Sequence, residues 1–102
     1  MDIADIRAKL TAGRYEFSRH AFERSVERNI SKEDIRQAGS RAEVIEDYPD
    51  DKYSPSCLVA GFTDGNRALH MQVCYTYFKK LKIITIYEPE VEQWDNFLIR
   101  KN

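Results

Sequence analysis

The feature that most constrains the fold is a stretch of alternating residues between positions 57 and 87 that only short turns interrupt. Alternation with a period of two is typical of strands, and TDGNR and FKKLK each have the composition of a hairpin turn. Because connections this short make neighbouring strands antiparallel, the sequence predicts a meander sheet. A further strand is predicted at 42–48, before a loop rich in Pro, Asp and Ser. The other predicted strands are 57–62, 68–78 and 81–87.

Apolar residues in the N-terminal part of the chain recur instead at helical spacing, which predicts three short helices before the sheet. Ser18 and Ser31 are predicted N-caps, with Asp34 as an approximate capping-box partner of Ser31, and Gly13 and Gly39 are predicted stops. The predicted inward positions are Ile3, Ile6 and Leu10 in the first helix, Phe22, Val26 and Ile30 in the second, and Ile35 and Ala38 in the third.

A closing helix is predicted at 89–100, because Val91, Trp94 and Leu98 share one helical face after Pro89. No repeat, low-complexity segment or linker divides the chain, so residues 1–102 are predicted to form a single domain. The expected fold class is α+β, with N-terminal helices packed on a four-stranded antiparallel meander sheet and a short C-terminal helix.

The hairpin at TDGNR also predicts which side chains share a sheet face. A two-residue turn at Gly65-Asn66 pairs Leu58 with Val73, and a turn at Asp64-Gly65 shifts the pairing by two without exchanging the faces. The predicted helix-facing residues are Leu58, Met71, Val73, Ile84 and Ile86. The predicted opposite face, where we expect any chemistry, carries His70, Gln72, Thr85 and Tyr87, with Cys57 across from Cys74.

Composition argues against several classes of protein. A formal net charge of −1 argues against attachment to nucleic acid by bulk charge alone, and no apolar run approaches the roughly 18 residues of a membrane span. The N-terminus lacks the apolar core of a signal peptide, so we expect a cytoplasmic domain without membrane contact. The two cysteines form no CxxC pair and the two histidines no HxH or HxxxH spacing, so we expect reduced thiols, no metal site and no cofactor.

Two groups of residues carry candidate chemistry. In the second helix His20, Arg24 and Arg28 form one stripe, where the two arginines repel each other unless something such as an anion offsets their charge. The stretch 66–87 contains no acidic residue, and a basic, aromatic surface suits phosphates and bases. Its members are Arg67, His70, Tyr75, Tyr77, Lys79, Lys80, Lys82 and Tyr87.

The same residues also have structural interpretations, in which they carry no chemistry. Stripes such as the one on the second helix are commonly solvated faces, here neutralised by Glu23 and Glu27. Lysines at a turn commonly solubilise it and protect a sheet edge. His70 is suited equally to a functional and a structural role, and Trp94 is favoured as a core anchor.

The second helix carries the pattern F-x-x-H-A-x-x-R-x-x-x-R-x-I-S from Phe17 to Ser31. Further markers follow in order, namely V-I-E-x-Y-P at 44–49, C-L-V-x-G at 57–61, L-H-M-x-V at 69–73, I-T-x-Y-x-P at 84–89 and Trp94. Together they resemble the bacterial family called domain of unknown function 4258, over roughly residues 15–100. That family typically has glycine where this chain has Asn29, which also tolerates the left-handed conformation.

The resemblance implies a barnase/RelE-like fold and a metal-independent endoribonuclease that acts as the toxin of a toxin–antitoxin pair. It implies RNA as the substrate and a zinc-finger or helix-turn-helix antitoxin as the protein partner. The expected catalytic residues are His20, Arg24, His70 and Tyr87, and the expected substrate-binding residues are Arg28, Lys80, Lys82, Thr85 and Arg100. The alternative is a non-catalytic module that binds nucleic acid or protein through the same surface, and a third is a domain whose histidines and arginines only brace the fold.

Overall fold

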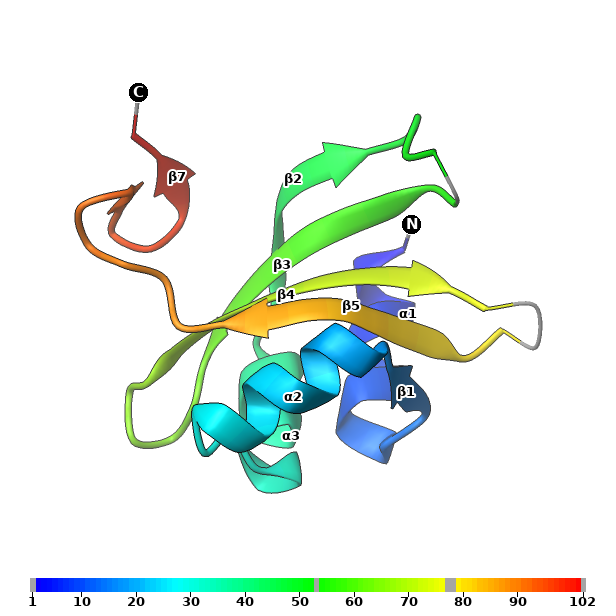
Figure 1. Cartoon of the computed structure of the whole chain (residues 1–102), viewed down its shortest axis with the longest axis horizontal. Helices are drawn as coiled ribbons and strands as arrows, with labels where there is room; N and C mark the ends of the chain where they lie inside the picture. Colours follow the sequence, from blue (N-terminus) through cyan, green and yellow to red (C-terminus); the bar gives the residue numbers. More distant parts are fainter. Residues whose placement is uncertain (1, 53, 77–78, 102) are drawn as a thin grey trace.

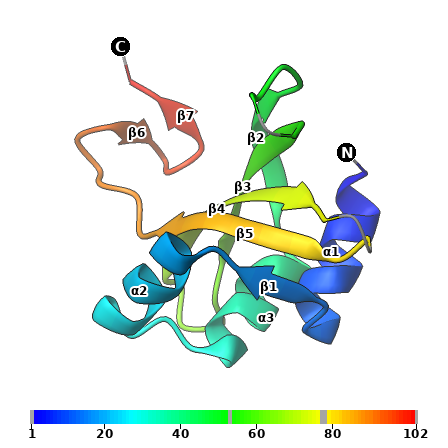
Figure 2. The same cartoon turned by 45° about the vertical axis from the view of Figure 1, so that its right-hand side comes forward.

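In the residues that it describes, 2–52, 54–76 and 79–101, the computed structural model has three helices and a five-stranded main sheet (Figure 1). The helices are α1 (Ile3–Ala12), α2 (Arg19–Glu27) and α3 (Lys32–Ser40). The strands are β1 (Tyr15–Phe17), β2 (Glu43–Tyr48), β3 (Ser56–Phe62), β4 (Ala68–Tyr75), β5 (Leu81–Tyr87), β6 (Trp94–Asp95) and β7 (Ile99–Arg100). The predicted α+β class is confirmed, with the helices on one side of the sheet and β6 and β7 on the other (Figures 1 and 2).

The main sheet has the order β1-β5-β4-β3-β2. Strands β2 to β5 form the antiparallel meander that the short turns predict. The prediction missed β1, which pairs parallel to β5 with Tyr15 opposite Leu81 and Phe17 opposite Ile83. A strand of three residues is too short to show a period, so the sequence predicts four antiparallel strands where the structure has a mixed sheet of five.

The register of the β3–β4 hairpin differs by one residue from the predicted register. Leu58 lies opposite Gln72 instead of Val73, because a three-residue loop replaces the expected two-residue turn. In that loop Asn66 has a left-handed backbone (φ 65°), and its N–H donates to the Thr63 carbonyl oxygen at 2.9 Å. A shift of one residue exchanges the faces of β3, so Leu58 faces away from the helices.

A β-bulge in β5 changes a second predicted core position. Ile84 has no opposite residue, because the pairing jumps between Gln72 and Val73 of β4. Ile83 therefore takes the core position that was predicted for Ile84. The other predicted helix-facing residues do lie in the core, namely Met71, Val73 and Ile86.

Three of the four predicted caps lie at helix ends. The Ser18 side chain accepts a backbone hydrogen bond at the start of α2, and Ser31 and Asp34 form a complete capping box at the start of α3. Gly13 ends α1 in the left-handed conformation (φ 73°). None of the helices in the described ranges is both long enough and apolar enough to cross a membrane.

The rotation of α2 about its axis differs from the prediction. Phe22 and Val26, which were predicted to face inward, are 57% and 61% exposed, whereas Ala21 and Ser25 are buried. The N-cap Ser18 sets this rotation, because its N–H and its hydroxyl donate to two carbonyl oxygens of β5 at 2.9 and 2.7 Å. Small inward side chains then let α2 approach the edge of β5 closely.

Two glycines allow α1, α3 and β3 to pack closely. Gly39 lies inside α3 rather than ending it as predicted, and a Cβ added there would lie 2.5 Å from Leu10 Cβ of α1. A Cβ added to Gly61 of β3 would lie 2.0 Å from the carbonyl oxygen of Ala38 in α3. The helix backbone therefore sits directly on the sheet at this point.

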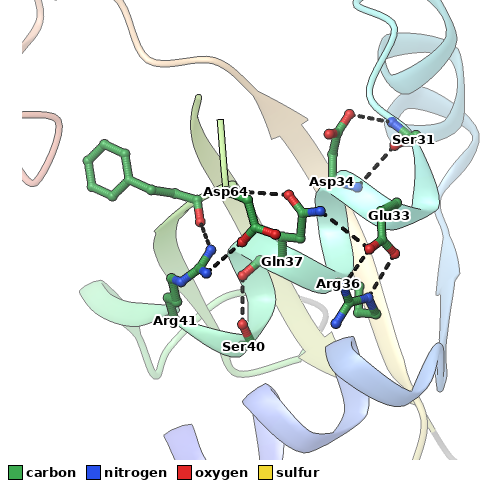
Figure 3. Close-up of polar contacts among 9 residues, drawn as sticks. Ser31, Glu33, Asp34, Arg36, Gln37, Ser40, Arg41 and Asp64 are labelled. Atoms are coloured by element: carbon green, nitrogen blue, oxygen red, sulfur yellow. Dashed lines mark hydrogen bonds and ion pairs between the residues drawn. The ribbon is translucent and has the colours of Figure 1, made fainter. Parts of the chain in front are cut away.

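Polar contacts tie the outer face of α3 to the β3–β4 turn (Figure 3). The Asp64 N–H donates to the Gln37 side chain at 2.9 Å, and Arg41 lies 2.6 Å from the Asp64 carboxylate. Arg41 also donates to the Phe62 carbonyl oxygen at 3.0 Å. These bonds hold the turn that sets the β3–β4 register.

The predicted C-terminal helix at 89–100 is wrong. β6 and β7 pair as a small antiparallel hairpin instead. Its turn has left-handed backbones at Asn96 (φ 51°) and Phe97 (φ 66°), and the Leu98 N–H donates to the Asp95 carbonyl oxygen at 3.0 Å, which closes a tight turn. Asparagine favours this turn, and Trp94 is buried, so local turn chemistry and packing outweigh the helical spacing.

Candidate functional site

A cleft of about 250 Å³ lies between α2 and the C-terminal end of β5. α2 continues beside β5 beyond the end of the short strand β1, so its side chains border this edge of the sheet (Figure 2). The lining residues are Arg24, Arg28, Thr85, Ile86, Tyr87, Glu88, Glu90 and Gln93. The residues that line the cleft thus include two arginines, two glutamates and a tyrosine.

The two cleft arginines differ in their partners. Arg24 Nη1 lies 3.0 Å from the Glu27 carboxylate, as the solvated-face interpretation expects. The Arg28 side chain has no polar partner within the part of the chain that the structure describes. Like charges four residues apart on a helix repel, so an anion bound between Arg24 and Arg28 would offset the repulsion between them.

Arg67 fixes the C-terminal end of α2 relative to β5. Its guanidinium donates to the carbonyl oxygens of Arg28 at 2.5 Å and Asn29 at 3.0 Å. The same group lies 2.6 Å from the Glu88 carboxylate at the exit of β5. Asn29 has a left-handed backbone (φ 53°), as expected for this turn. Arg67 is therefore a structural member of the basic stretch, and it holds Arg28 at the cleft.

His70 lies on β4 directly opposite Tyr87, which lines the cleft. Its side chain is fully buried, and the Trp94 ring packs against it edge-on with 4.4 Å between the ring centroids. Nδ1 lies 3.2 Å from the Tyr87 hydroxyl, and Nε2 contacts the Phe97 carbonyl oxygen. Burial lowers the pKa of His70 below 6.5, although the Phe97 carbonyl and the Glu46 carboxylate oppose this shift. The imidazole is therefore neutral at pH 7.

Residues 17–88 match the model of the family described as Domain of unknown function (DUF4258). The chain belongs to this family. No curated protein and no solved structure matches the chain. The matched residues include α2 and strands β2 to β5, with Arg24, Arg28, Thr85 and Tyr87, and they end before β6 and β7. The main cleft walls therefore belong to the DUF4258 unit, whereas the hairpin that covers His70 follows it.

The DUF4258 cleft brings together only some of the residues expected at a site, namely Arg24, Arg28, Thr85 and Tyr87. His20 is exposed on α2 one turn before Arg24 and does not line the cleft. Lys80 is exposed before the start of β5, at the opposite end of that strand from Tyr87. Lys82 lines a separate hollow of about 290 Å³ together with Cys74.

Arg100 of this DUF4258 chain lies on β7 rather than on a C-terminal helix. Its Nε and Nη2 donate to the Glu46 carboxylate at 3.0 and 3.1 Å, and its guanidinium carbon lies 4.5 Å from the centre of the Trp94 ring. The ion pair lowers the pKa of Glu46 and raises that of Arg100. Arg100 thus fastens the hairpin to β2. Tyr77, which was counted with the basic, aromatic stretch, lies outside the described residues.

The acidic side of the DUF4258 cleft was missed at the sequence level. The cleft is lined beside Tyr87 by Glu88, Glu90 and Gln93. These residues are neither basic nor aromatic, so the pattern that predicted a phosphate-binding surface does not include them. Their position after a predicted strand was a usable signal, because residues that directly follow a strand lie at the same edge of the sheet as its last side chains. Glu88 directly follows β5, and Glu90 lies two residues further along the chain.

A larger hollow of about 500 Å³ lies at the β2–β3 loop of the DUF4258 unit. Its lining residues are Tyr48, Pro49, Asp50, Asp51 and Gln72. Two carboxylates and no basic side chain face this hollow in the described part of the chain, so it repels phosphate. We therefore place the candidate site in the smaller cleft.

The two thiols of the DUF4258 chain lie on opposite faces of the sheet. Cys57 pairs with Val73 and Cys74 with Ser56, so the prediction that the cysteines face each other is wrong. Burial raises the pKa of both thiols, which disfavours the nucleophilic thiolate. Within the described ranges, no group of three or more His, Cys, Asp or Glu side chains could hold a metal ion.

Proposed function

We propose that this chain is a metal-independent endoribonuclease of the toxin type, with a barnase/RelE-like fold, and that it binds RNA in the α2–β5 cleft. The observation that carries the proposal is that Arg24 of α2 and Arg28 at its C-cap line the same cleft as Thr85 and Tyr87 of β5. Guanidinium groups suit a phosphodiester, because each presents a planar fork of N–H donors. A partly exposed phenol beside them suits a ribose or a base.

RNA is cut without a metal when its own 2′-hydroxyl acts as the nucleophile. The 2′-oxygen attacks the adjacent phosphorus, a P–O2′ bond forms and the P–O5′ bond breaks, which leaves a 2′,3′-cyclic phosphate and a 5′-hydroxyl. One proton leaves the 2′-oxygen and another reaches the 5′-oxygen, while negative charge develops on the phosphorane oxygens. The site must therefore supply a proton acceptor, a proton donor and cationic groups.

The residues in and beside the cleft match these three roles. Arg24 and Arg28 take the cationic role, because both line the cleft and Arg28 has no partner among the described residues. Tyr87 takes the acceptor role, since the neutral His70 ring behind it can receive the phenolic proton. His20 takes the donor role, because it lies on the same helix stripe one turn before Arg24, and an imidazole can transfer a proton near neutral pH.

As a toxin of this kind, the chain would act in the cytoplasm and be held inactive by an antitoxin protein. The family resemblance supports a zinc-finger or helix-turn-helix antitoxin as that partner. Phe22 and Val26 offer it an apolar surface on α2, the helix that supplies the cleft arginines.

The test is cleavage of RNA by the purified full chain in excess EDTA, followed by analysis of the RNA ends. We expect cutting to persist and to leave 2′,3′-cyclic phosphates. Arg28→Ala should lower the rate about 10²-fold, because it removes a donor to the developing charge. The matched control is Arg19→Ala on the same helix, where the side chain is 94% exposed and pairs with Glu23, and it should cut at the wild-type rate.

Either of two outcomes would contradict the proposed metal-independent ribonuclease activity. A chain that binds RNA through the cleft without cutting it, with or without ribosomes, would be the non-catalytic binding module. Cleavage that stops in EDTA, or that leaves linear phosphates only, would mean a different reaction.

A further inference from the structure

The contact between Tyr87 and His70 determines which hydrogen-bonding role Tyr87 can offer to the cleft. A carbonyl oxygen only accepts, so the contact between His70 Nε2 and the Phe97 oxygen requires a proton on Nε2. A neutral imidazole then has a lone pair on Nδ1, which lies 3.2 Å from the Tyr87 hydroxyl oxygen. The Tyr87 hydroxyl therefore donates its only proton to His70.

The surroundings keep His70 in this state. The titratable groups that face it are Tyr87 of β5, Glu46 of β2 and Arg100 of β7. Glu46 and Arg100 pair with each other at 3.0 Å and shift the pKa of His70 in opposite directions, so burial dominates and lowers it. Trp94 packs on the ring and helps to exclude water.

A phenol whose proton is engaged offers only oxygen lone pairs to a ligand. We propose that His70 positions the Tyr87 hydroxyl as an obligate acceptor for a ribose 2′-hydroxyl, so that the α2–β5 cleft selects RNA over DNA. Deoxyribose has no proton to donate at this position, and a 2′-O-methyl ribose has none either. The inference rests on the proposed function, because the ribose must lie in this cleft, and it makes His70 a positioning residue.

The protonation state of His70 gives the proposal a pH dependence of known sign. When His70 is protonated, Nδ1 donates to Tyr87, and His70 no longer accepts the phenolic proton. Tyr87 is then a donor and no longer needs a 2′-hydroxyl. The preference for RNA is therefore present at neutral pH and is lost as the pH falls through the pKa of His70, which lies below 6.5.

The test compares three short strands of one base sequence, with ribose, deoxyribose or 2′-O-methyl ribose, for binding to the full chain in EDTA. Binding is followed by rapid mixing, before the ribose strand is cut, and each strand is checked for integrity on a gel. At neutral pH the wild-type chain should bind the ribose strand about three- to tenfold more tightly than the other two, the effect of one hydrogen bond. Tyr87→Phe removes only the hydroxyl and should abolish the preference. The matched control Tyr75→Phe, at the other end of β4 and β5, should keep it.

Variants of His70 separate positioning from packing. His70→Gln keeps one donor and one acceptor but cannot titrate, so its RNA preference should persist unchanged down to about pH 5. His70→Leu lacks the acceptor and should lose the preference while retaining affinity for the deoxyribose strand. If His70→Leu does not fold, the wild-type pH series and Tyr87→Phe decide the question.

The outcomes distinguish this inference from the proposed function. Equal binding of the three strands at neutral pH overturns the inference even if RNA is cut. So does an RNA preference that survives in the wild-type chain below the pH at which the His70 ring becomes protonated, as followed by NMR of that ring. A pH-dependent RNA preference without cleavage leaves the inference standing and removes the ribonuclease activity. Failure to bind any strand overturns both.

Discussion

At the scale of a single residue, His70 shows why the sequence leaves both a functional and a structural role open for a side chain. It occupies an alternating position on the sheet face expected to carry chemistry, yet its ring is fully buried by a segment that was predicted to be a helix. The ring packs like a core residue and still contacts Tyr87, which lines the cleft. Alternation predicts the face of a side chain but not what covers that face.

Burial of His70 predicts a pH-dependent stability. The pKa of His70 is lowered in the folded chain relative to 6.5, so the unfolded chain binds more protons as the pH falls below that value. The free energy of unfolding should therefore decrease from about pH 6.5 downward, more steeply in the wild-type chain than in His70→Gln. Urea denaturation at a series of pH values measures this.

The two curves are compared over the whole pH series, because the charge on His70 also acts on the pKa of Glu46. Parallel curves for wild type and His70→Gln would contradict the account of the buried ring.

At the scale of helices and strands, the sequence predicts the features that residues close together in the chain determine. The capping box of Ser31 and Asp34, the left-handed stop at Gly13 and the antiparallel meander are all confirmed. The register of β3 is wrong by one residue, because TDGNR accommodates a three-residue loop as readily as a two-residue turn. The rotation of α2 is wrong because Ser18 bonds to a strand far away in the sequence.

The sequence likewise predicts only those features of the candidate site that neighbouring residues determine. Arg24 and Arg28 were predicted on one helix stripe and Thr85 and Tyr87 on one sheet face, and the structure brings the two pairs to one cleft. The sequence could not show where α2 meets β5, since that depends on the parallel pairing of β1. It also could not show that Arg100 would leave the expected site and bind Glu46.

The C-terminal hairpin of β6 and β7 should open independently of the main sheet. Arg100 fastens it through a half-exposed ion pair with Glu46 and a contact with Trp94, which together contribute about 1 kcal/mol. Arg100→Ala should therefore speed hydrogen exchange of the β6–β7 amides about fivefold and leave β3 and β4 unchanged. Lys101→Ala removes only an exposed contact of 3.9 Å with Asp95 and should change neither. Uniformly faster exchange across the main sheet in Arg100→Ala would show that the hairpin is part of the core unit.

At the scale of the whole molecule, the close seating of α3 on the sheet is the packing feature that tolerates change least. Gly61→Ala places a Cβ 2.0 Å from the Ala38 carbonyl oxygen, which is backbone and cannot move without α3. We expect a loss of about 3 kcal/mol in the free energy of unfolding. Gly65→Ala is the matched control, because the nearest contact of its Cβ is the Thr63 hydroxyl at 3.9 Å. Equal stability of the two variants, measured by urea denaturation, would refute this packing.

The proposed function requires RNA to bind between α2 and the end of β5. Titration of the ¹⁵N-labelled full chain with a short 2′-O-methyl RNA, which cannot be cut at its own 2′-oxygen, maps the contact by backbone amide shifts. We predict that the largest shifts fall in 24–28 and 85–93, and that Arg28→Ala reduces them while Arg19→Ala does not. Shifts confined to the acidic hollow at 48–51 or to the start of β5 around Lys80, with 24–28 unchanged, would contradict the account.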